Sequence, residues 1–295
     1  MTDAAADPRP SPAPSPAPSW RDSLPEPLVK LLKRRPRVHV LRLYGAIGMS
    51  GRGGFSLSDE ALSGPIEKAF SGRPLAVALA VNSPGGSPAQ SSMIAARIRR
   101  LSEQKGVPVV AFCEDAAASG GYWLACAADE IYADRSSLVG SIGVIFAGFG
   151  LHELLERYGV ERRVHTAGDR KLILDPFQPE REEDVADLRA IQSDVHEAFI
   201  AYVKGRRGDR LDKAETQGVD LFTGAVFTGA QAETLGLVDG LGHLAAIMKA
   251  RHGEEIRFRE YRARRGLLSR LGVSEALAGA LGAVEARALW SRFGM

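Results

Sequence analysis

The sequence predicts an α/β fold, because apolar segments of strand length alternate with segments that carry a helical pattern. Residues 75–81 (LAVALAV) form a continuous apolar run, as expected for a strand that is buried on both faces. A turn at residues 82–87 (NSPGGS) follows and leads into a helical pattern over residues 91–101. Residues 107–113 (VPVVAFC) form the next apolar run, and this strand, helix, strand order is typical of right-handed crossovers.

The other elements of the first half are predicted in the same way. Residues 38–43 (VHVLRL) alternate well enough to form a strand. Residues 57–71 have a helical pattern, which Gly-Arg-Pro at residues 72–74 ends. Residues 130–133 (EIYA) form another strand. The uncharged stretch 136–151 is interrupted by four glycines, and we interpret it as buried strand and turn.

In the second half of the chain, residues 180–204 predict one long helix. Residues 222–229 predict an extended segment, and residues 230–235 predict a short helix. Residues 274–293 carry an apolar stripe, which suits a helix packed on the body or on a neighbouring subunit, with membrane contact as the alternative. The apolar residues at helical spacing in the long helix are Val185, Leu188, Ile191, Val195, Phe199 and Tyr202.

Both ends of the chain differ from its middle. Residues 1–19 are rich in proline, cannot form a core and should be disordered or adopt a polyproline II-like conformation. Residues 28–35 mix apolar and basic residues, so they form either a short helix that caps the body or a helix that lies on an anionic membrane surface. We therefore divide the chain into a tail with this short segment (1–36), a body (37–260) and an amphipathic helical extension (261–295).

Bulk properties exclude several classes of protein. A net charge of +2 gives no reason to expect a nucleic-acid partner. No secretory signal is visible, and no apolar run reaches the roughly 18 residues of a spanning helix, so we expect a cytoplasmic protein whose basic-apolar segments allow loose attachment to the inner membrane. Cys113 and Cys126 suit buried small hydrophobes, and the six histidines form no ligand cluster, so neither a metal nor a cofactor is expected.

A serine and a lysine carry the strongest chemical signal. Ser119 follows three alanines and precedes two glycines, and Lys171 lies 52 positions further along. A serine hydroxyl is a poor nucleophile until a base takes its proton, and a lysine amine can be that base when burial lowers its pKa. The glycine after Ser119 offers an N–H group to a developing oxyanion. Taken singly, Ser119 also suits a helix N-cap, and Lys171 also suits an ordinary surface lysine.

Several motifs extend this signal, in a fixed order along the chain. They are residues 82–87, 118–122 (ASGGY), 139–144 (VGSIGV), 168–171 (GDRK) and 227–239 (FTGAQAETLGLVD). Together they resemble the signal peptide peptidase A family of serine peptidases (protease IV, SppA and SohB) over roughly residues 38–250. The resemblance implies a ClpP/crotonase-type fold with repeated ββα units and additional C-terminal helices, and it implies a Ser–Lys dyad.

The resemblance also implies a role for each matching residue. Ser119 matches the nucleophile, and Lys171 matches the general base. Gly120 and Gly86 match the residues whose N–H groups form the oxyanion hole. Ser141 matches a motif serine that orients the lysine amine.

The sequence therefore predicts a serine endopeptidase that hydrolyses short, apolar, extended peptides, such as remnant signal peptides. The resemblance implies a homo-oligomer in which neighbouring subunits complete the substrate cleft. Two alternatives stay open. One is a crotonase-like acyl-CoA enzyme, which would use the same glycine N–H groups on a thioester. The other is a non-catalytic scaffold that binds peptides.

Overall fold

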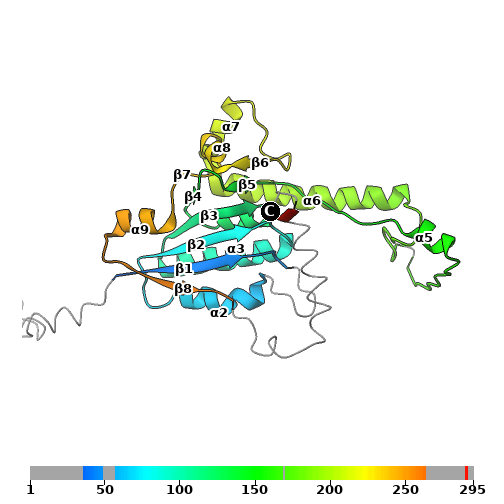
Figure 1. Ribbon diagram of the computed structural model, residues 1–295, viewed down its shortest axis with the longest axis horizontal. Helices are drawn as coiled ribbons and strands as arrows, with labels where there is room; N and C mark the ends of the chain where they lie inside the picture. Colours follow the sequence, from blue (N-terminus) through cyan, green and yellow to red (C-terminus); the bar gives the residue numbers. More distant parts are fainter. Residues whose placement is uncertain (1–35, 49–56, 169, 264–289, 292–295) are drawn as a thin grey trace, which may run out of the picture. The chain divides into compact units, whose positions relative to one another are not determined.

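A computed structural model describes residues 36–48, 57–168, 170–263 and 290–291. Its described part contains an eight-stranded sheet with the order β6-β5-β3-β2-β1-β8, from which β4 and β7 branch at β3 (Figure 1). Among the described strands, every pair is parallel except β5 with β6. The strands are β1 (Arg37–Tyr44), β2 (Ala76–Ser83), β3 (Val109–Ala118), β4 (Glu130–Ala133), β5 (Leu138–Gly140), β6 (Val226–Thr228), β7 (Gly240–Leu241) and β8 (Arg257–Tyr261).

Helices pack on both faces of the sheet, because neighbouring residues of a strand point to opposite faces. Leu79 of β2 enters a large apolar cluster with α2, α3 and α4, whereas Ala78 enters a smaller cluster with Met248 of α9. The mixed α/β class is therefore as predicted. The helices are α2 (Asp59–Ala69), α3 (Pro88–Lys105), α4 (Gly120–Ala125), α5 (His152–Arg157), α6 (Glu182–Arg207), the 3₁₀ helix η2 (Gly208–Leu211), α7 (Asp212–Thr216), α8 (Gly229–Thr234) and α9 (Leu244–His252).

The central β2–α3 unit follows directly from the sequence. β2 lies between β1 and β3, and nearly all of its side chains are buried, which explains its uninterrupted apolar run. α3 begins where the Ser87 hydroxyl accepts a hydrogen bond from the Gln90 N–H and where Pro88 occupies the first turn. It ends at Gly106, whose φ of +61° is the left-handed conformation that glycine adopts at helix ends.

Two features of the sheet were not predicted. β3 continues to Ala118, five residues beyond the apolar run, and it changes its partner on the way, because Val110–Cys113 pair with β4 whereas Ala116–Ala118 pair with β5. β8 pairs with β1 although its sequence, RFREY, is mostly polar. An edge strand tolerates this composition because most of its side chains remain in contact with water.

Residues 144–191, which we call the arm, differ from the remaining described residues of 37–260, for which we keep the name body. The interpretation of residues 136–151 as buried is correct for Val139 but wrong beyond residue 144, because Ile145, Phe146 and Phe149 are exposed. The long helix is confirmed as α6, yet its apolar stripe is not buried throughout: Ile191 is 56% exposed and Phe199 is 3% exposed. Only the last turns of α6 therefore pack on the body.

Several predictions concern residues outside the described part of the chain. The tail and the segment 28–35 lie there, as does the C-terminal stripe except for residues 290–291, which are helical. No helix among the described residues is both long enough and apolar enough to span a membrane. The predicted boundaries at residues 36 and 260 stay predictions, and β8 extends one residue past the second of them.

Candidate active site

Ser119 lies at the turn between β3 and α4, where its backbone is strained. Its φ of +53° and ψ of −121° are unusual for a residue with a side chain and cost roughly 1–3 kcal/mol. The Ser119 N–H donates to the carbonyl of Gly140 in β5 at 2.8 Å, which holds the turn against the sheet. The side chain makes no capping hydrogen bond to α4, so the N-cap interpretation lacks its defining contact. The turn instead presents the hydroxyl at the end of the strand, as in a nucleophile elbow.

Two glycine N–H groups near Ser119 have no partner in the described part of the chain. Ile47 donates to the Gly85 carbonyl at 2.9 Å and accepts from the Ser87 N–H at 2.8 Å. This parallel bridge leaves the N–H of the residue between them, Gly86, directed away from Ile47. Gly120 is the first residue of α4, so its N–H has no acceptor within the helix.

Close packing brings these two backbone segments together. A Cβ atom on Gly85 would lie 2.8 Å from the Ser119 Cβ atom and 3.0 Å from the Gly120 nitrogen. A Cβ atom on Gly86 would lie 2.1 Å from the carbonyl oxygen of Ile47. Glycine is therefore required at residues 85 and 86, and the backbone donors lie beside the serine without intervening side chains.

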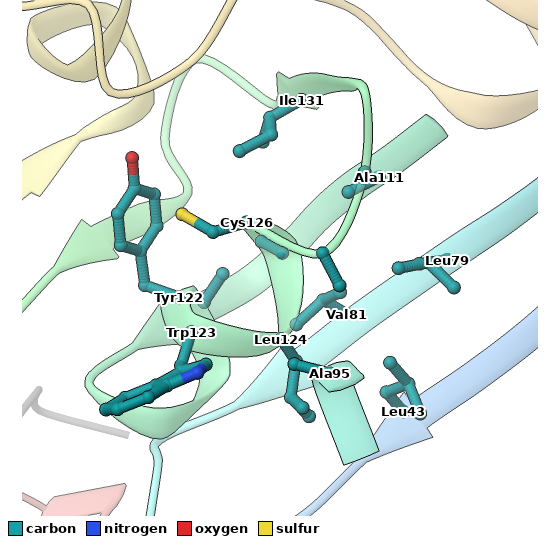
Figure 2. Packing of buried hydrophobic residues seen from close by; sticks show 14 of the residues in the cluster. Leu43, Leu79, Val81, Ala95, Ala111, Tyr122, Trp123, Leu124, Cys126 and Ile131 are labelled. Atoms are coloured by element: carbon teal, nitrogen blue, oxygen red, sulfur yellow. The ribbon is translucent and has the colours of Figure 1, made fainter. Parts of the chain in front are cut away.

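α4 is held in place by buried aromatic residues. The Tyr122 hydroxyl donates to the Leu237 carbonyl at 2.8 Å, while Trp123 stacks on Phe199 and Tyr202 of α6 with ring centroids 4.6 and 5.1 Å away. Figure 2 shows that Tyr122 and Trp123 leave α4 in different directions. The helix that follows Ser119 is thus anchored to both the Leu237 segment and the end of α6.

A buried ion pair missed in the sequence supports this anchor. Arg207, the last residue of α6, is only 2% exposed, and its guanidinium donates to the Gly236 carbonyl and to the Asp239 carboxylate. The same carboxylate accepts the Ile131 N–H of β4 at 2.7 Å. The sequence did contain a signal that Arg207 is buried, because residue 207 continues the helical spacing of Phe199 and of the buried residue 203. The motif at 236–239 is therefore structural support for the site.

Ser141 is linked to Ser119 through the neighbouring strand β5. It follows Gly140, whose carbonyl accepts the Ser119 N–H, and its own N–H donates to the Ala225 carbonyl at 2.7 Å. Its φ of +52° is strained, like that of Ser119. The Ser141 hydroxyl makes no hydrogen bond with Lys171 among the described residues, so the lysine-orienting role stays a prediction.

Lys171 lies on the arm, with an exposed side chain. Its N–H donates to the Gly168 carbonyl at 3.2 Å, and its amine has no partner in the part of the chain that the structure describes. Two contacts tie this turn to the beginning of α6: Arg170 pairs with Asp187, and the Leu174 N–H donates to the Asp184 carboxylate.

The arm holds Lys171 away from Ser119 of the same chain. Asp187 precedes Phe199 by about three turns of α6, or about 18 Å along the helix axis at 1.5 Å per residue. Phe199 is the residue that packs beside α4, on Trp123. No hydrogen bond joins the Ser119 hydroxyl to the Lys171 amine within the described chain, so the Ser119–Lys171 dyad stays a prediction.

The geometry at Ser119 defines a class of protein. A serine hydroxyl on a strained turn, beside two unpaired backbone N–H groups, is the arrangement with which serine hydrolases bind the oxyanion of a tetrahedral intermediate. The buried cysteines do not compete for the role of nucleophile, because burial raises the pKa of the Cys126 thiol to about 12. The thiolate is therefore scarce at neutral pH.

The comparison with known families identifies the class more closely. Residues 102–256, more than half of the chain, match the profile of "Peptidase family S49". The chain belongs to this family, and the resemblance noted in the sequence is confirmed.

Curated relatives agree with this assignment. A "Putative signal peptide peptidase SppA" of Enterococcus faecium is 33% identical over 57% of this chain and 47% of its own length. A "Probable protease SohB" of Haemophilus influenzae is 29% identical over 66% of this chain and 54% of its own length. A "Na(+)/H(+) antiporter NhaA" of Brucella melitensis is 43% identical over 92% of this chain but only 40% of its own length. The chain thus spans about half, or less, of the length of these relatives.

Solved structures agree on the fold. A lysine-to-alanine mutant of 1510-N, a membrane-bound stomatin-specific protease of Pyrococcus horikoshii in complex with a substrate peptide, superposes with a TM-score of 0.50. The match covers 85% of this chain and 99% of that chain, at 14% sequence identity. The ClpP-like fold predicted from the motifs is therefore confirmed.

Proposed function

We propose that this chain is a serine endopeptidase that hydrolyses short, extended, apolar peptides, such as remnant signal peptides. The observation that carries the proposal is the strained Ser119 turn beside the unpaired N–H groups of Gly86 and Gly120. Backbone strain at a polar side chain is retained where function requires it. Membership of a peptidase family supplies the reaction class.

In this mechanism the Ser119 hydroxyl attacks the peptide carbonyl while the uncharged amine of Lys171 accepts its proton. The Gly86 and Gly120 N–H groups donate to the oxyanion that forms, and removal of one such donor costs on the order of 3 kcal/mol. The lysine ammonium then protonates the leaving amine. Water hydrolyses the acyl-enzyme, with the same lysine as base and Ser119 as leaving group.

We propose further that Lys171 acts on Ser119 of a neighbouring copy of this chain. The exposed amine, held about three helical turns beyond the contact between α6 and α4, supports this arrangement. An interface that excludes water would also favour the uncharged amine that the mechanism needs.

The surface of the arm supports a second copy as its partner. Ten of the thirteen large hydrophobic side chains that are exposed in the described chain lie between residues 145 and 191. The arm also contains a hollow of about 720 Å³, lined by Phe146, Phe149, Leu174 and Leu188 among others. Exposed apolar surface of this kind is typical of an interface.

Mixing two inactive variants tests this proposal. Ser119→Ala and Lys171→Ala should each lower peptidase activity on a fluorogenic apolar peptide by at least about a thousandfold. The two proteins, unfolded and refolded together, should regain activity, because a mixed assembly pairs an intact serine with an intact lysine. Lys213→Ala removes an exposed lysine of α7 and should leave activity unchanged.

The outcomes of this experiment separate the alternatives. Full activity of both variants would exclude the dyad, and binding of a CoA thioester would then favour the acyl-CoA enzyme. Peptide affinity without turnover in the wild-type protein would favour the scaffold. Inactive single variants that never regain activity on mixing would retain the dyad but place both residues in one chain.

A further inference from the structure

The register between β2 and β3 shifts just before the candidate active site. Up to Val81, which pairs with Cys113, the two strands advance residue by residue. The next pair is Ser83 with Ala117, so β2 advances by two residues while β3 advances by four. β3 therefore contains a bulge, and bulges commonly re-aim a strand next to an active site.

One side chain spans this bulge. Asn82 lies on β2 opposite the extra residues, and its Nδ2 donates to the Asp115 carboxylate at 2.6 Å. Its Oδ1 accepts the N–H of Ala116 at 3.3 Å. Its backbone carbonyl accepts the N–H of Gly45 at 2.9 Å, at the end of β1. The Asn82 amide thus replaces the ladder hydrogen bonds that the bulge removes.

Both halves of the candidate site follow this bulge directly. On β2, the chain continues from Ser83 to the glycine turn that contains Gly86. On β3, it continues from Ala117 to Ser119, and β3 pairs with β5 from Ala116, within the bulge, to Ala118. The spacing between the oxyanion donors and the nucleophile therefore depends on how far β3 is displaced relative to β2.

We propose that Asn82 is a positioning residue, which sets the distance between the glycine turn and Ser119 by holding the β3 bulge. The proposal rests on the peptidase function proposed above. Asn82 acts through backbone placement and contacts no reacting atom. Substrate binding does not require this placement, whereas stabilisation of the oxyanion does. A substitution of Asn82 should therefore lower kcat and leave KM nearly unchanged.

The experiment replaces the amide by a carboxylate of the same shape. Asn82→Asp removes the donor to Asp115 and places two carboxylates in contact. A misplacement of the catalytic groups by about 1 Å lowers kcat by on the order of a hundredfold, and we expect a loss of that size. The reversed pair N82D/D115N restores one donor and one acceptor across the bulge and should recover most of kcat. The rate of labelling of Ser119 by a fluorophosphonate should fall and recover in parallel.

Controls distinguish this inference from a general loss of stability. Glu130→Gln breaks a comparable surface contact, between β4 and Arg251 of α9, and should leave kcat unchanged. The inference is overturned if N82D keeps its kcat, or if N82D/D115N stays as slow as N82D although both proteins are folded by circular dichroism. Activity retained by Ser119→Ala would refute the peptidase proposal itself, which is a separate result.

Discussion

The body and the arm differ in how far their apolar residues are buried. Around Ser119 the chain buries almost every large hydrophobic side chain, and the residues of α4 are all buried. Around Lys171 such side chains are exposed, and α5 buries none of its residues. The two residues of the predicted dyad thus lie in regions of different kinds: Ser119 in a densely packed region, and Lys171 in a region with much exposed apolar surface, as is typical of an interface.

This difference supports the proposal that the dyad forms between two copies of the chain. Ser119 and the glycines predicted to form the oxyanion hole depend on strands and helices that are packed within the body. The predicted base depends on a turn held by surface ion pairs, such as Arg170 with Asp187, which are individually worth about 0–1 kcal/mol. In the proposed assembly, a second chain would cover the arm and order it. The same contact would bring Lys171 of one chain to Ser119 of the other.

The strongest test of the comparison removes apolar side chains from the arm. Phe149, 84% exposed, and Ile191, 56% exposed, are changed in the variant Phe149→Ser with Ile191→Glu. We expect monomers by light scattering and a loss of at least about a thousandfold in peptidase activity if the base comes from a neighbour. The monomer should remain folded by circular dichroism, because both changed side chains are exposed in the single chain.

A matched change on the body gives the control. Met93, on α3, is also half exposed, and Met93→Gln should leave assembly and activity intact. The comparison breaks down if the arm variant still assembles and cleaves, or if the Met93 variant dissociates.

The next test concerns the support of the body. Asp239→Asn removes the charge that pairs with the buried Arg207, and loss of one partner of such a pair costs about 3–5 kcal/mol. We expect a loss of that order in urea unfolding at pH 7. An unchanged midpoint would show that the pair does not anchor α6.

The Arg207–Asp239 pair also predicts how the difference in stability between the wild type and Asp239→Asn varies with pH. Burial disfavours the Asp239 carboxylate, but its hydrogen bonds and its attraction to Arg207 outweigh this effect and hold the pKa of Asp239 below its usual range. A carboxyl whose folded-state pKa is depressed stabilises the protein above its unfolded pKa of about 3.9. That contribution is lost as the pH falls through the lowered folded value. Wild type and Asp239→Asn should therefore converge in stability below about pH 4.

The smallest expected effect lies in α6, the helix that joins the two regions. A Cβ atom on Gly205 would meet nothing within 4 Å, so Gly205→Ala should stabilise the chain by about 1 kcal/mol through helix propensity. Thermal unfolding measures the change. A loss of stability in the assembled protein would instead show that a neighbouring copy packs against Gly205, and the interface would extend beyond the arm.

Local patterns predicted much of the fold. β1, β2, β4, α3 and α6 were found where apolar periodicity and end signals indicated, because those signals act within a few residues. β8 was missed because a polar edge strand has little apolar pattern and is formed by pairing with β1, more than two hundred residues earlier. The exposed stretch from Ile145 onward was misjudged because composition alone does not distinguish exposed apolar residues from buried ones.

The candidate site was predictable only in part. Ser119 and the glycines stand in short motifs whose backbone demands are local, so their roles could be proposed from the sequence. The register shift that Asn82 spans, the burial of Arg207 and the location of Lys171 all depend on contacts between distant segments. The spacing of 52 residues between the serine and the lysine contained no information about whether they meet within one chain or between two.

The backbone conformation of Ser119 has a consequence for substitutions at this position. Glycine adopts a φ of +53° without the energetic penalty that serine incurs. The residue that best fits this backbone conformation is therefore one that has no hydroxyl. A glycine at this position would give a more stable protein that lacks the proposed nucleophile. Under the proposed mechanism, the chain therefore accepts a conformational cost at Ser119 in return for a reactive hydroxyl.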